Sequence, residues 1–269
     1  MRFRAETRRL GGAGLGRFAT DAPTARVLRS FTTGRISMHP NIVGAAVRRY
    51  FALSLLLLIL TFQAVPQAGL PREVGKREAH LVELITLEPT IKLDIRYATD
   101  NNFVGKKVYP EARAFLQKPA AKAVAKVHRK LRDKGLGIVI FDGYRPWSIT
   151  KLFWEVTSED KRKFVANPAK GSKHNRGCAV DLSIFDLRTG QLIDMPSGYD
   201  EFTERASPDY TGGTAEQRAN REMLRKLMED AGFTVNPNEW WHFDYKDWER
   251  YAIYDISFGE AAKSNDQDN

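Results

Sequence analysis

Regular spacing of apolar residues predicts one strand and two helices in the chain after residue 70. Residues 91–97 alternate apolar and polar side chains, as a half-buried strand does. Residues 120–134 place apolar side chains three and four positions apart and precede Gly135, which is typical of an amphipathic helix that ends at a glycine. Residues 216–231 repeat the helical spacing and precede Gly232. Both types of element are therefore expected in the folded part.

Three further apolar runs predict strands. Residues 138–141 are continuously apolar, whereas residues 179–184 and 240–245 alternate. Between the first two runs a helix is expected, from Ser148, whose hydroxyl can cap it, to about Val156. Strands and helices interleave without an internal repeat. We therefore expect a single α+β domain with a central, mostly antiparallel sheet flanked by helices.

Two segments lack regular spacing. Residues 186–214 are rich in Gly, Pro and Ser and predict a long loop, and loops of that length often carry function. Residues 261–269 are polar and are expected to be frayed. With these segments included, the expected domain covers residues 69–269.

An apolar run precedes this domain. Residues 50–62 are apolar over about 13 positions, fewer than the roughly 20 that a membrane-spanning helix needs. Arg48 and Arg49 come before the run and small residues follow it, which is the pattern of a secretory signal. We expect residues 50–68 to be a signal peptide or an uncleaved N-terminal anchor, after a basic, disordered extension over residues 1–49. We therefore expect an exported protein, periplasmic or anchored facing the periplasm, or a cytoplasmic one if the true start lies downstream of the apolar run.

The net charge of +9 at pH 7 belongs mainly to that extension. Residues 1–50 hold ten arginines against Glu6 and Asp21, a net charge of +8, which leaves +1 for the rest. The predicted helix at 120–134 is also basic, but it has no aromatic side chains between its charges that could stack on bases. It is expected to be a solvated helix face. We therefore expect no nucleic-acid partner.

The chain has one cysteine, Cys178. A single cysteine excludes an internal disulfide framework and a cysteine-rich zinc module. We interpret Cys178 as a small buried side chain without a chemical role.

Histidines and a carboxylate supply candidate metal ligands. His80 and His128 are expected at solvated positions. His174 begins a segment that ends at Asp181, and His242 closes the sequence Glu-Trp-Trp-His. A catalytic zinc site takes three protein ligands and keeps a fourth position open for water. His174, Asp181 and His242 can provide this set, because a glycine between the first two lets the chain fold back.

Two further residues have the chemistry that such a metal site needs for hydrolysis. Glu239 lies three residues before His242 and can act as a general acid and base. Arg145 follows a predicted strand and can stabilise negative charge on a carbonyl oxygen. Taken singly, residues of these types are more often structural, so the prediction depends on their combination.

The combination resembles a known family. Ser-x-His-x-x-Gly-x-Ala-x-Asp followed by Glu-x-x-His is similar to the zinc D,D-peptidases that include the D-alanyl-D-alanine dipeptidases of the VanX type. Further segments resemble the dipeptidases in particular, in the same order: Asp94–Thr99 with Asn102–Gly105, Asp142–Pro146, and Met195–Phe202. The resemblance covers roughly residues 80–258.

This resemblance implies hydrolysis of D-alanyl-D-alanine to two D-alanines, in cell-wall turnover or in glycopeptide resistance. It implies one zinc ion per subunit on the three ligands above, with Glu239 as acid and base and Arg145 as transition-state stabiliser. It also implies that Asp200 helps to hold the ammonium group of the substrate and that Ser172 contacts its carboxylate. Cys178 departs from the family pattern, between two of the ligand positions.

Two alternatives stay open from the sequence. The first is a D,D-carboxypeptidase that trims peptidoglycan stem peptides, and the second is a zinc-stabilised binding module without catalysis. The expected partner is a small D,D-dipeptide. Membrane contact is expected only through the N-terminal segment, if that segment is not cleaved.

Overall fold

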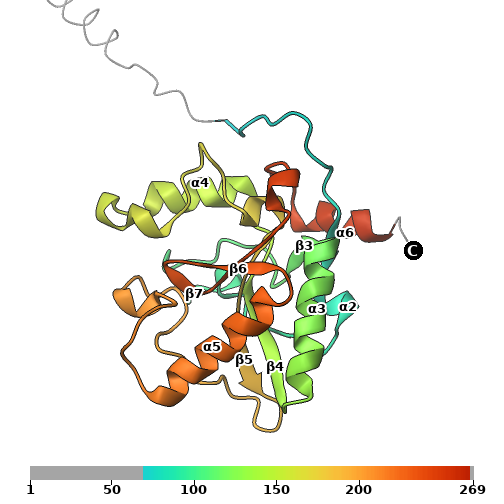
Figure 1. Ribbon diagram of the computed structural model, residues 1–269. Coiled ribbons are helices and arrows are strands. Elements are labelled where there is room, and N and C mark those ends of the chain that lie inside the picture. Colours follow the sequence, from blue (N-terminus) through green and yellow to red (C-terminus); the bar gives the residue numbers. More distant parts are fainter. Residues whose placement is uncertain (1–68, 267–269) are drawn as a thin grey trace, which may run out of the picture. The chain divides into compact units, whose positions relative to one another are not determined.

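A five-stranded sheet forms the centre of the protein (Figure 1). The computed structural model describes residues 69–266, which fall within one compact unit, Val65–Asn269. The sheet order is β2-β4-β5-β7-β6, with β2 parallel to β4 and every other neighbouring pair antiparallel. Its strands are β2 (Lys92–Leu93), β4 (Leu136–Asp142), β5 (Ala179–Asp186), β6 (Phe233–Asn236) and β7 (Glu239–Tyr245). The predicted α+β fold with a mostly antiparallel sheet is confirmed.

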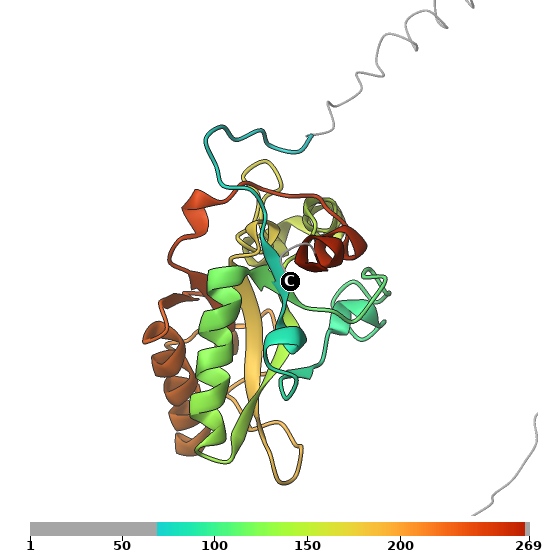
Figure 2. The same cartoon turned by 90° about the vertical axis from the view of Figure 1, so that its right-hand side faces the viewer.

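Two long helices, α3 (Lys118–Arg132) and α5 (Ala215–Glu229), cover one face of this sheet (Figure 2). A second sheet pairs β1 (Leu81–Glu83) with β3 (Phe115–Gln117) in antiparallel register. The remaining α-helices are α2 (Leu84–Leu87), α4 (Trp147–Val156) and α6 (Phe258–Asp266). Short 3-10 helices are η1 (Arg96–Ala98), η2 (Glu159–Phe164), η3 (His174–Arg176), η4 (Glu204–Ala206) and η5 (Trp248–Arg250).

The local sequence explains both long helices. In α3, Val124, Val127 and Leu131 lie on one stripe and are almost completely buried, so the helix is held by its apolar face. At the start of α5, the Thr214 side chain accepts from the Gln217 backbone, and the Gln217 side chain accepts from the Thr214 backbone. This capping box satisfies backbone donors that a helix otherwise leaves unpaired.

The alternation of side chains along β5 separates the core from the polar face. Val180, Leu182 and Ile184 are fully buried on one face of the strand. Asp181 and Ser183 point to the other face, which is also buried. The apolar face packs in the core, and the polar face is available for a functional site.

The strand predicted at residues 91–97 is much shorter than expected. Only Lys92 and Leu93 pair with β4, Asp94 adds one backbone bond to Ile140, and the chain then turns into η1. The predicted burial of apolar positions is nevertheless found, since Ile91, Ile95 and Tyr97 are all buried. A turn can bury alternate residues as a strand does, so the pattern alone could not distinguish the two.

The prediction that His128 is solvated is wrong. His128 is fully buried where α3 meets β4, and its Nδ1 accepts the backbone N–H of Ile138 at 3.0 Å. Its Nε2 lies 2.9 Å from the hydroxyl of Thr90, which donates to Glu88. His80 is partly buried rather than solvated, and its backbone N–H donates to a side chain of β3.

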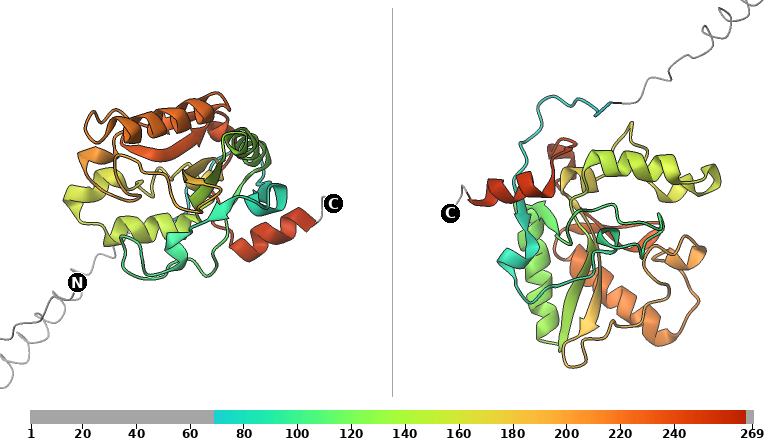
Figure 3. Two further views of the ribbon diagram at one scale, coloured as in Figure 1. Left: turned by 90° about the horizontal axis from the view of Figure 1, so that it is seen from below. Right: turned by 180° about the vertical axis from the view of Figure 1, so that it is seen from behind.

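Two expectations near the C-terminal end also need correction. Residues 258–266 form α6, which packs against β1, so the predicted frayed tail is a helix over most of its length (Figure 3). Ser148 does not cap α4, because the N-cap residue of this helix is Pro146. The backbone N–H and hydroxyl of Ser148 instead donate to Asp255, at 2.9 and 2.7 Å, and link α4 to the C-terminal segment.

The proposed extension at residues 1–49 and the signal or anchor at residues 50–68 lie outside the described residues. Within residues 69–266, no helix is long and apolar enough to span a bilayer.

Candidate metal centre and active-site pocket

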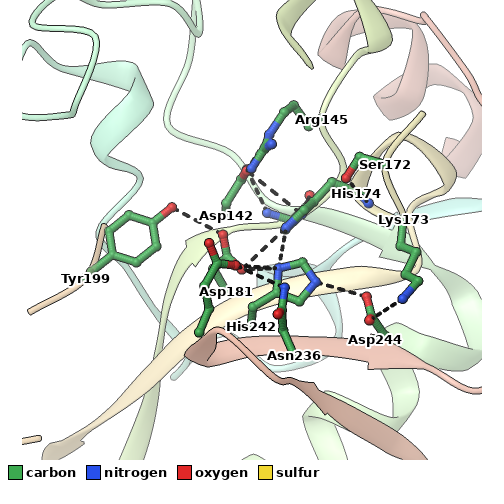
Figure 4. A network of polar contacts seen from close by, with 12 residues as sticks. Asp142, Arg145, Ser172, Lys173, His174, Asp181, Tyr199, Asn236, His242 and Asp244 are labelled. Atoms are coloured by element: carbon green, nitrogen blue, oxygen red, sulfur yellow. Dashed lines mark hydrogen bonds and ion pairs between the residues drawn. The ribbon is translucent and has the colours of Figure 1, made fainter. Parts of the chain in front are cut away.

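The three predicted metal ligands converge on the polar face of the sheet (Figure 4). Asp181 and His242 are paired across β5 and β7, and His174 comes from η3, just before β5. Gly177 ends η3 with φ +65°, and a Cβ at this position would lie 2.4 Å from a methyl group of Leu81. Glycine is therefore required for the turn that carries His174 back to Asp181.

The donor atoms of this cluster form a small triangle. Nε2 of His174 lies 3.1 Å from Nδ1 of His242, and Oδ1 of Asp181 lies 3.3 and 3.0 Å from these two nitrogens. Ligands of a tetrahedral zinc ion at about 2.0–2.1 Å are separated by roughly this distance. Oδ1 of Asp181 is buried and accepts no hydrogen bond from the residues that the structure describes. An unpaired buried carboxylate oxygen facing two imidazole nitrogens is the arrangement that a cation would satisfy.

Each ligand is oriented by a second contact through its other polar atom. Nδ1 of His174 lies 2.7 Å from the carbonyl oxygen of Gly143, and Nε2 of His242 lies 2.9 Å from Oδ1 of Asp244. Donation to these oxygens leaves the opposite ring nitrogens as lone-pair donors toward the triangle. The Tyr199 hydroxyl donates to Oδ2 of Asp181 at 3.2 Å. The donor set therefore fits a zinc ion.

The charges of the cluster also favour a cation. Burial would raise the pKa of Asp181, but His174 and His242 hold it well below its usual value. Burial would lower the pKa of His242, but Asp244 and Asp181 raise it well above the usual value. The carboxylates thus stabilise positive charge at this position.

Glu239 begins β7 and faces the same cluster. Its Oε2 lies 3.7 Å from Nδ1 of His242 and accepts from the side-chain amide of Asn236 at 3.2 Å. Burial and the charge of Asp181 raise the pKa of Glu239 to about 7, although His242 acts in the opposite direction. A carboxylate with a pKa near neutrality is suited to take up and return a proton.

Arg145 is held in place by a buried carboxylate. Its Nε and Nη2 both donate to Oδ2 of Asp142, at 3.0 and 2.7 Å, and the guanidinium lies over the ring of Phe153. Asp142 in turn accepts from the Tyr109 hydroxyl at 2.8 Å. Burial alone would lower the pKa of Arg145, but Asp142 raises it well above the usual value. The hydroxyl of Tyr144, adjacent in sequence, bonds to the Ile256 backbone.

All seven predicted site residues line one pocket with a cavity volume of about 390 Å³. They are Arg145, Ser172, His174, Asp181, Asp200, Glu239 and His242. Residues of α4 and of the segment that follows β2 also line the pocket, whereas no residue of α3 or α5 does. The structure thus brings together residues that are up to about 97 positions apart in sequence.

Comparison with known proteins decides the family. Residues 77–263 match the M15 peptidase family described as D-Ala-D-Ala dipeptidase. The chain belongs to this family. The chain is similar to the D-alanyl-D-alanine dipeptidase of Escherichia coli strain K12, with 34% identity over 61% of this chain and 83% of that protein. It is also similar to the enzyme of the same name from Enterococcus faecalis, with 36% identity over 57% of this chain and 85% of that protein.

Among solved structures, a vancomycin-resistance D,D-dipeptidase in complex with a D-Ala-D-Ala phosphinate analogue matches this dipeptidase-family chain. The TM-score is 0.33 at 18% identity, over 70% of this chain and 71% of the other. The predicted family and enzyme class are confirmed by the sequence matches.

Asp200 is a further carboxylate that lines the pocket of this dipeptidase-family chain, and it is partly buried. Asp200 has φ +57° and is the one described non-glycine residue with positive φ. Its Oδ2 accepts from the Tyr97 hydroxyl at 2.8 Å. Burial and the charges of Asp181 and Glu239 raise the pKa of Asp200 well above its usual value, in spite of the Tyr97 hydrogen bond. Among residues 69–266 this carboxylate has no ion-pair partner, and the charge of Arg145 lowers its pKa only in part.

Ser172 lies two residues before His174 and also lines the pocket. Its hydroxyl accepts from the backbone N–H of His174 at 3.2 Å, and its own N–H donates to Asn175 at 2.7 Å. The residue thus shapes the turn before His174 as well as lining the pocket.

Sequence reasoning gave no role to several residues of the dipeptidase-family site. Asp142, Tyr97, Tyr199 and Asp244 each contact a predicted site residue. A signal was present for Asp244, since it lies two positions after His242 in a strand and so shares its face. Asp142 precedes Arg145 by three residues. The tyrosines lie in two of the segments that resemble the dipeptidases, Asp94–Thr99 and Met195–Phe202, but no pattern within these segments predicts which site residue each hydroxyl contacts.

Cys178 is fully buried, and burial raises the pKa of its thiol to about 12. The thiol is therefore a poor nucleophile, as the sequence predicted.

Proposed function

We propose that this protein is a zinc-dependent dipeptidase that hydrolyses D-alanyl-D-alanine to two D-alanines. The observation that carries the proposal is the unpaired Oδ1 of Asp181 between two imidazole nitrogens, in one pocket with Glu239 and Arg145. A metal-binding module without catalysis would not need an acid–base carboxylate and a buried guanidinium in the same pocket.

His174, Asp181 and His242 would hold the metal ion. When bound, zinc supplies a Lewis acid and lowers the pKa of a water to about 7. The hydrogen bonds to Gly143, Asp244 and Tyr199 keep the three ligands oriented. Because these ligands are already within 3.0–3.3 Å of one another, little reorganisation is needed on binding.

Glu239 carries the proton in the proposed reaction. Its carboxylate takes a proton from the attacking water and returns it to the nitrogen of the leaving D-alanine. The carboxyl group of Glu239 lies beside the cluster. Among the described residues, His242 is its only ion-pair partner. In the metal-free site, burial raises the pKa of Glu239 and makes it a stronger base than an exposed glutamate.

Arg145 stabilises the negative charge that grows on the carbonyl oxygen of the scissile bond. The guanidinium is buried, so its charge acts through a medium of low dielectric. Two N–H groups bind Asp142, which fixes the plane of the guanidinium and leaves its remaining donors for the substrate.

The two ends of the dipeptide would bind on either side of the cluster. Asp200, held by Tyr97, would pair with the ammonium group, which supplies the ion-pair partner that this carboxylate lacks among residues 69–266. Ser172 would contact the carboxylate of the second D-alanine.

Pairing of Asp200 with a free amino group favours a dipeptidase over a D,D-carboxypeptidase. In a stem peptide the corresponding nitrogen is acylated and carries no charge, so Asp200 would gain no cationic partner from the substrate. Hydrolysis of D-alanyl-D-alanine, its N-acetyl derivative and a pentapeptide stem tests this. Turnover of the free dipeptide alone is expected. Faster turnover of the pentapeptide would instead support the carboxypeptidase.

Export remains part of this proposal. It is supported by the apolar run at residues 50–62 and the arginines before it. Fractionation of cells that express the full chain, with N-terminal sequencing of the product, would distinguish a cleaved signal from an anchor. Activity confined to the cytoplasmic fraction would contradict export.

A further inference from the structure

Lys173, which precedes the metal ligand His174 in sequence, contacts Asp244 on strand β7, and Asp244 contacts the ligand His242 (Figure 4). Nζ of Lys173 lies 2.6 Å from Oδ2 of Asp244, and Oδ1 of the same carboxylate lies 2.9 Å from Nε2 of His242. We propose that Lys173 is a positioning residue of the metal centre. It fixes the carboxylate of Asp244, which in turn holds the His242 ring with Nδ1 toward the metal. This inference rests on the zinc-dependent function proposed above.

The position of Lys173 is itself well determined. Its carbonyl oxygen accepts from the backbone N–H groups of Arg176 and Cys178, at 3.1 and 3.0 Å, so its backbone is fixed at the start of η3. Its ammonium group lies 5.0 Å from the centre of the Trp248 ring. Such a cation–π contact narrows the range of side-chain conformations and favours the one that reaches Asp244.

Asp244 depends on this lysine for its orientation. Among the described residues, its side chain has two hydrogen-bond partners, Lys173 on Oδ2 and His242 on Oδ1. Without the ammonium group, Oδ2 would have no donor and the carboxylate could rotate about its terminal bond. His242 would then lose the fixed acceptor that selects its tautomer and ring orientation.

A purely structural ion pair would have a different signature. The Lys173 side chain is 37% exposed, and ion pairs at that level of exposure contribute little to stability. The metal affinity is a more sensitive readout, because outer contacts of zinc ligands commonly change it ten- to a hundredfold.

The loss of the lysine charge and the loss of its positioning effect would change the zinc affinity in opposite directions. Removal of a nearby positive charge would by itself strengthen the binding of a cation. Loss of the fixed Asp244 carboxylate would weaken it. The direction of the change therefore shows which effect is larger.

The test is the zinc dissociation constant of the purified protein, measured by competition with a chromophoric chelator. For Lys173→Met we expect binding about tenfold weaker than for the wild type. The matched control is Lys170→Met, which removes the same charge from an exposed lysine at the same pocket and should change the constant less than twofold. Lys173→Arg, which retains a donor for Asp244, should recover most of the affinity. Unchanged or tighter zinc binding in Lys173→Met would overturn the proposal.

A double variant tests whether the effect passes through Asp244. In an Asp244→Asn background the addition of Lys173→Met should weaken zinc binding by less than twofold, because the contact is already altered. Fully additive losses would overturn the proposed route. Thermal unfolding of the metal-free variants verifies that each one folds.

Zinc binding by the wild-type protein shows whether a negative result concerns the proposed function or only the role of Lys173. A wild-type protein that binds no zinc would overturn the proposed function and this inference together. A wild type that binds zinc, with an unaffected Lys173→Met variant, would overturn the role of Lys173 alone.

Discussion

Oδ1 of Asp181 lies 3.0 Å from Nδ1 of His242, across a pair of antiparallel strands, and within residues 69–266 it accepts no hydrogen bond. The burial of a carboxylate oxygen in this way is costly unless a cation binds to it. The arrangement therefore connects the stability of the fold with the occupancy of the metal site.

Removal of metal should abolish turnover of D-alanyl-D-alanine and lower the melting temperature. Zinc at about a hundred times its dissociation constant should add about 2.7 kcal/mol to the free energy of unfolding. Scanning calorimetry of chelator-treated protein, before and after addition of zinc, measures the melting temperature. A hydrolysis assay of the same samples measures turnover. Magnesium at the same concentration is the control, because it prefers oxygen ligands and should restore neither. Equal recovery with magnesium would argue against the zinc assignment.

Glu239→Gln should lower kcat by about 10²- to 10⁴-fold, because the amide cannot take up the proton of water. The variant keeps the size of the side chain, so zinc should still bind. Steady-state kinetics together with metal analysis of the purified variant provide the measurement. Glu249→Gln, at an exposed position, is the control and should retain full activity. Retained hydrolysis in Glu239→Gln would remove this residue from the mechanism.

Arg145→Lys should lower kcat by about 10²-fold, since an ammonium group cannot bind Asp142 through two N–H groups and also face the substrate. Arg113→Lys is a matched control. Arg113 binds both carboxylate oxygens of Glu83, at 2.9 and 2.6 Å, and does not line the pocket. Its replacement should leave kcat near the wild-type value. Equal losses in the two variants would point to a structural effect instead of stabilisation of the transition state.

His128 should make the stability of the protein dependent on pH. Burial lowers the pKa of His128 below its ordinary value of 6.5, in spite of the opposing charge of Glu88. Protonation would remove the acceptor on Nδ1 that the Ile138 N–H needs. The contribution of neutral His128 is thus fully present above pH 6.5 and is lost as the pH falls through its folded pKa.

Chemical denaturation between pH 5 and 7.5 measures this effect. The free energy of unfolding should fall by up to about 1.4 kcal/mol per pH unit in this range because of His128 alone. His128→Asn, which can still accept from Ile138 but does not titrate, should show a shallower slope. Both proteins are compared with zinc in excess, so that the metal ligands contribute equally. Identical slopes would mean that His128 does not take up a proton on unfolding.

The sequence by itself determined the relative positions of site residues that lie close together in the chain. The spacing of His174, Gly177 and Asp181 is set by a single turn and the following strand, and Glu239 and His242 lie on one strand. In such segments the backbone geometry follows from neighbouring residues, so a motif predicts the positions of its side chains. Strands β4, β5 and β7, the two long helices and the family followed from the same kind of information, whereas β1, β3 and β6 were not predicted.

Only the tertiary structure decided which distant side chains complete the site. Tyr97 contacts Asp200 across 103 positions, and Lys173 contacts Asp244 across 71. His128 is buried by the packing of α3 on β4, although its helix is strongly basic. These contacts depend on how the elements pack, and packing is set by the whole core together. A local pattern therefore cannot predict them.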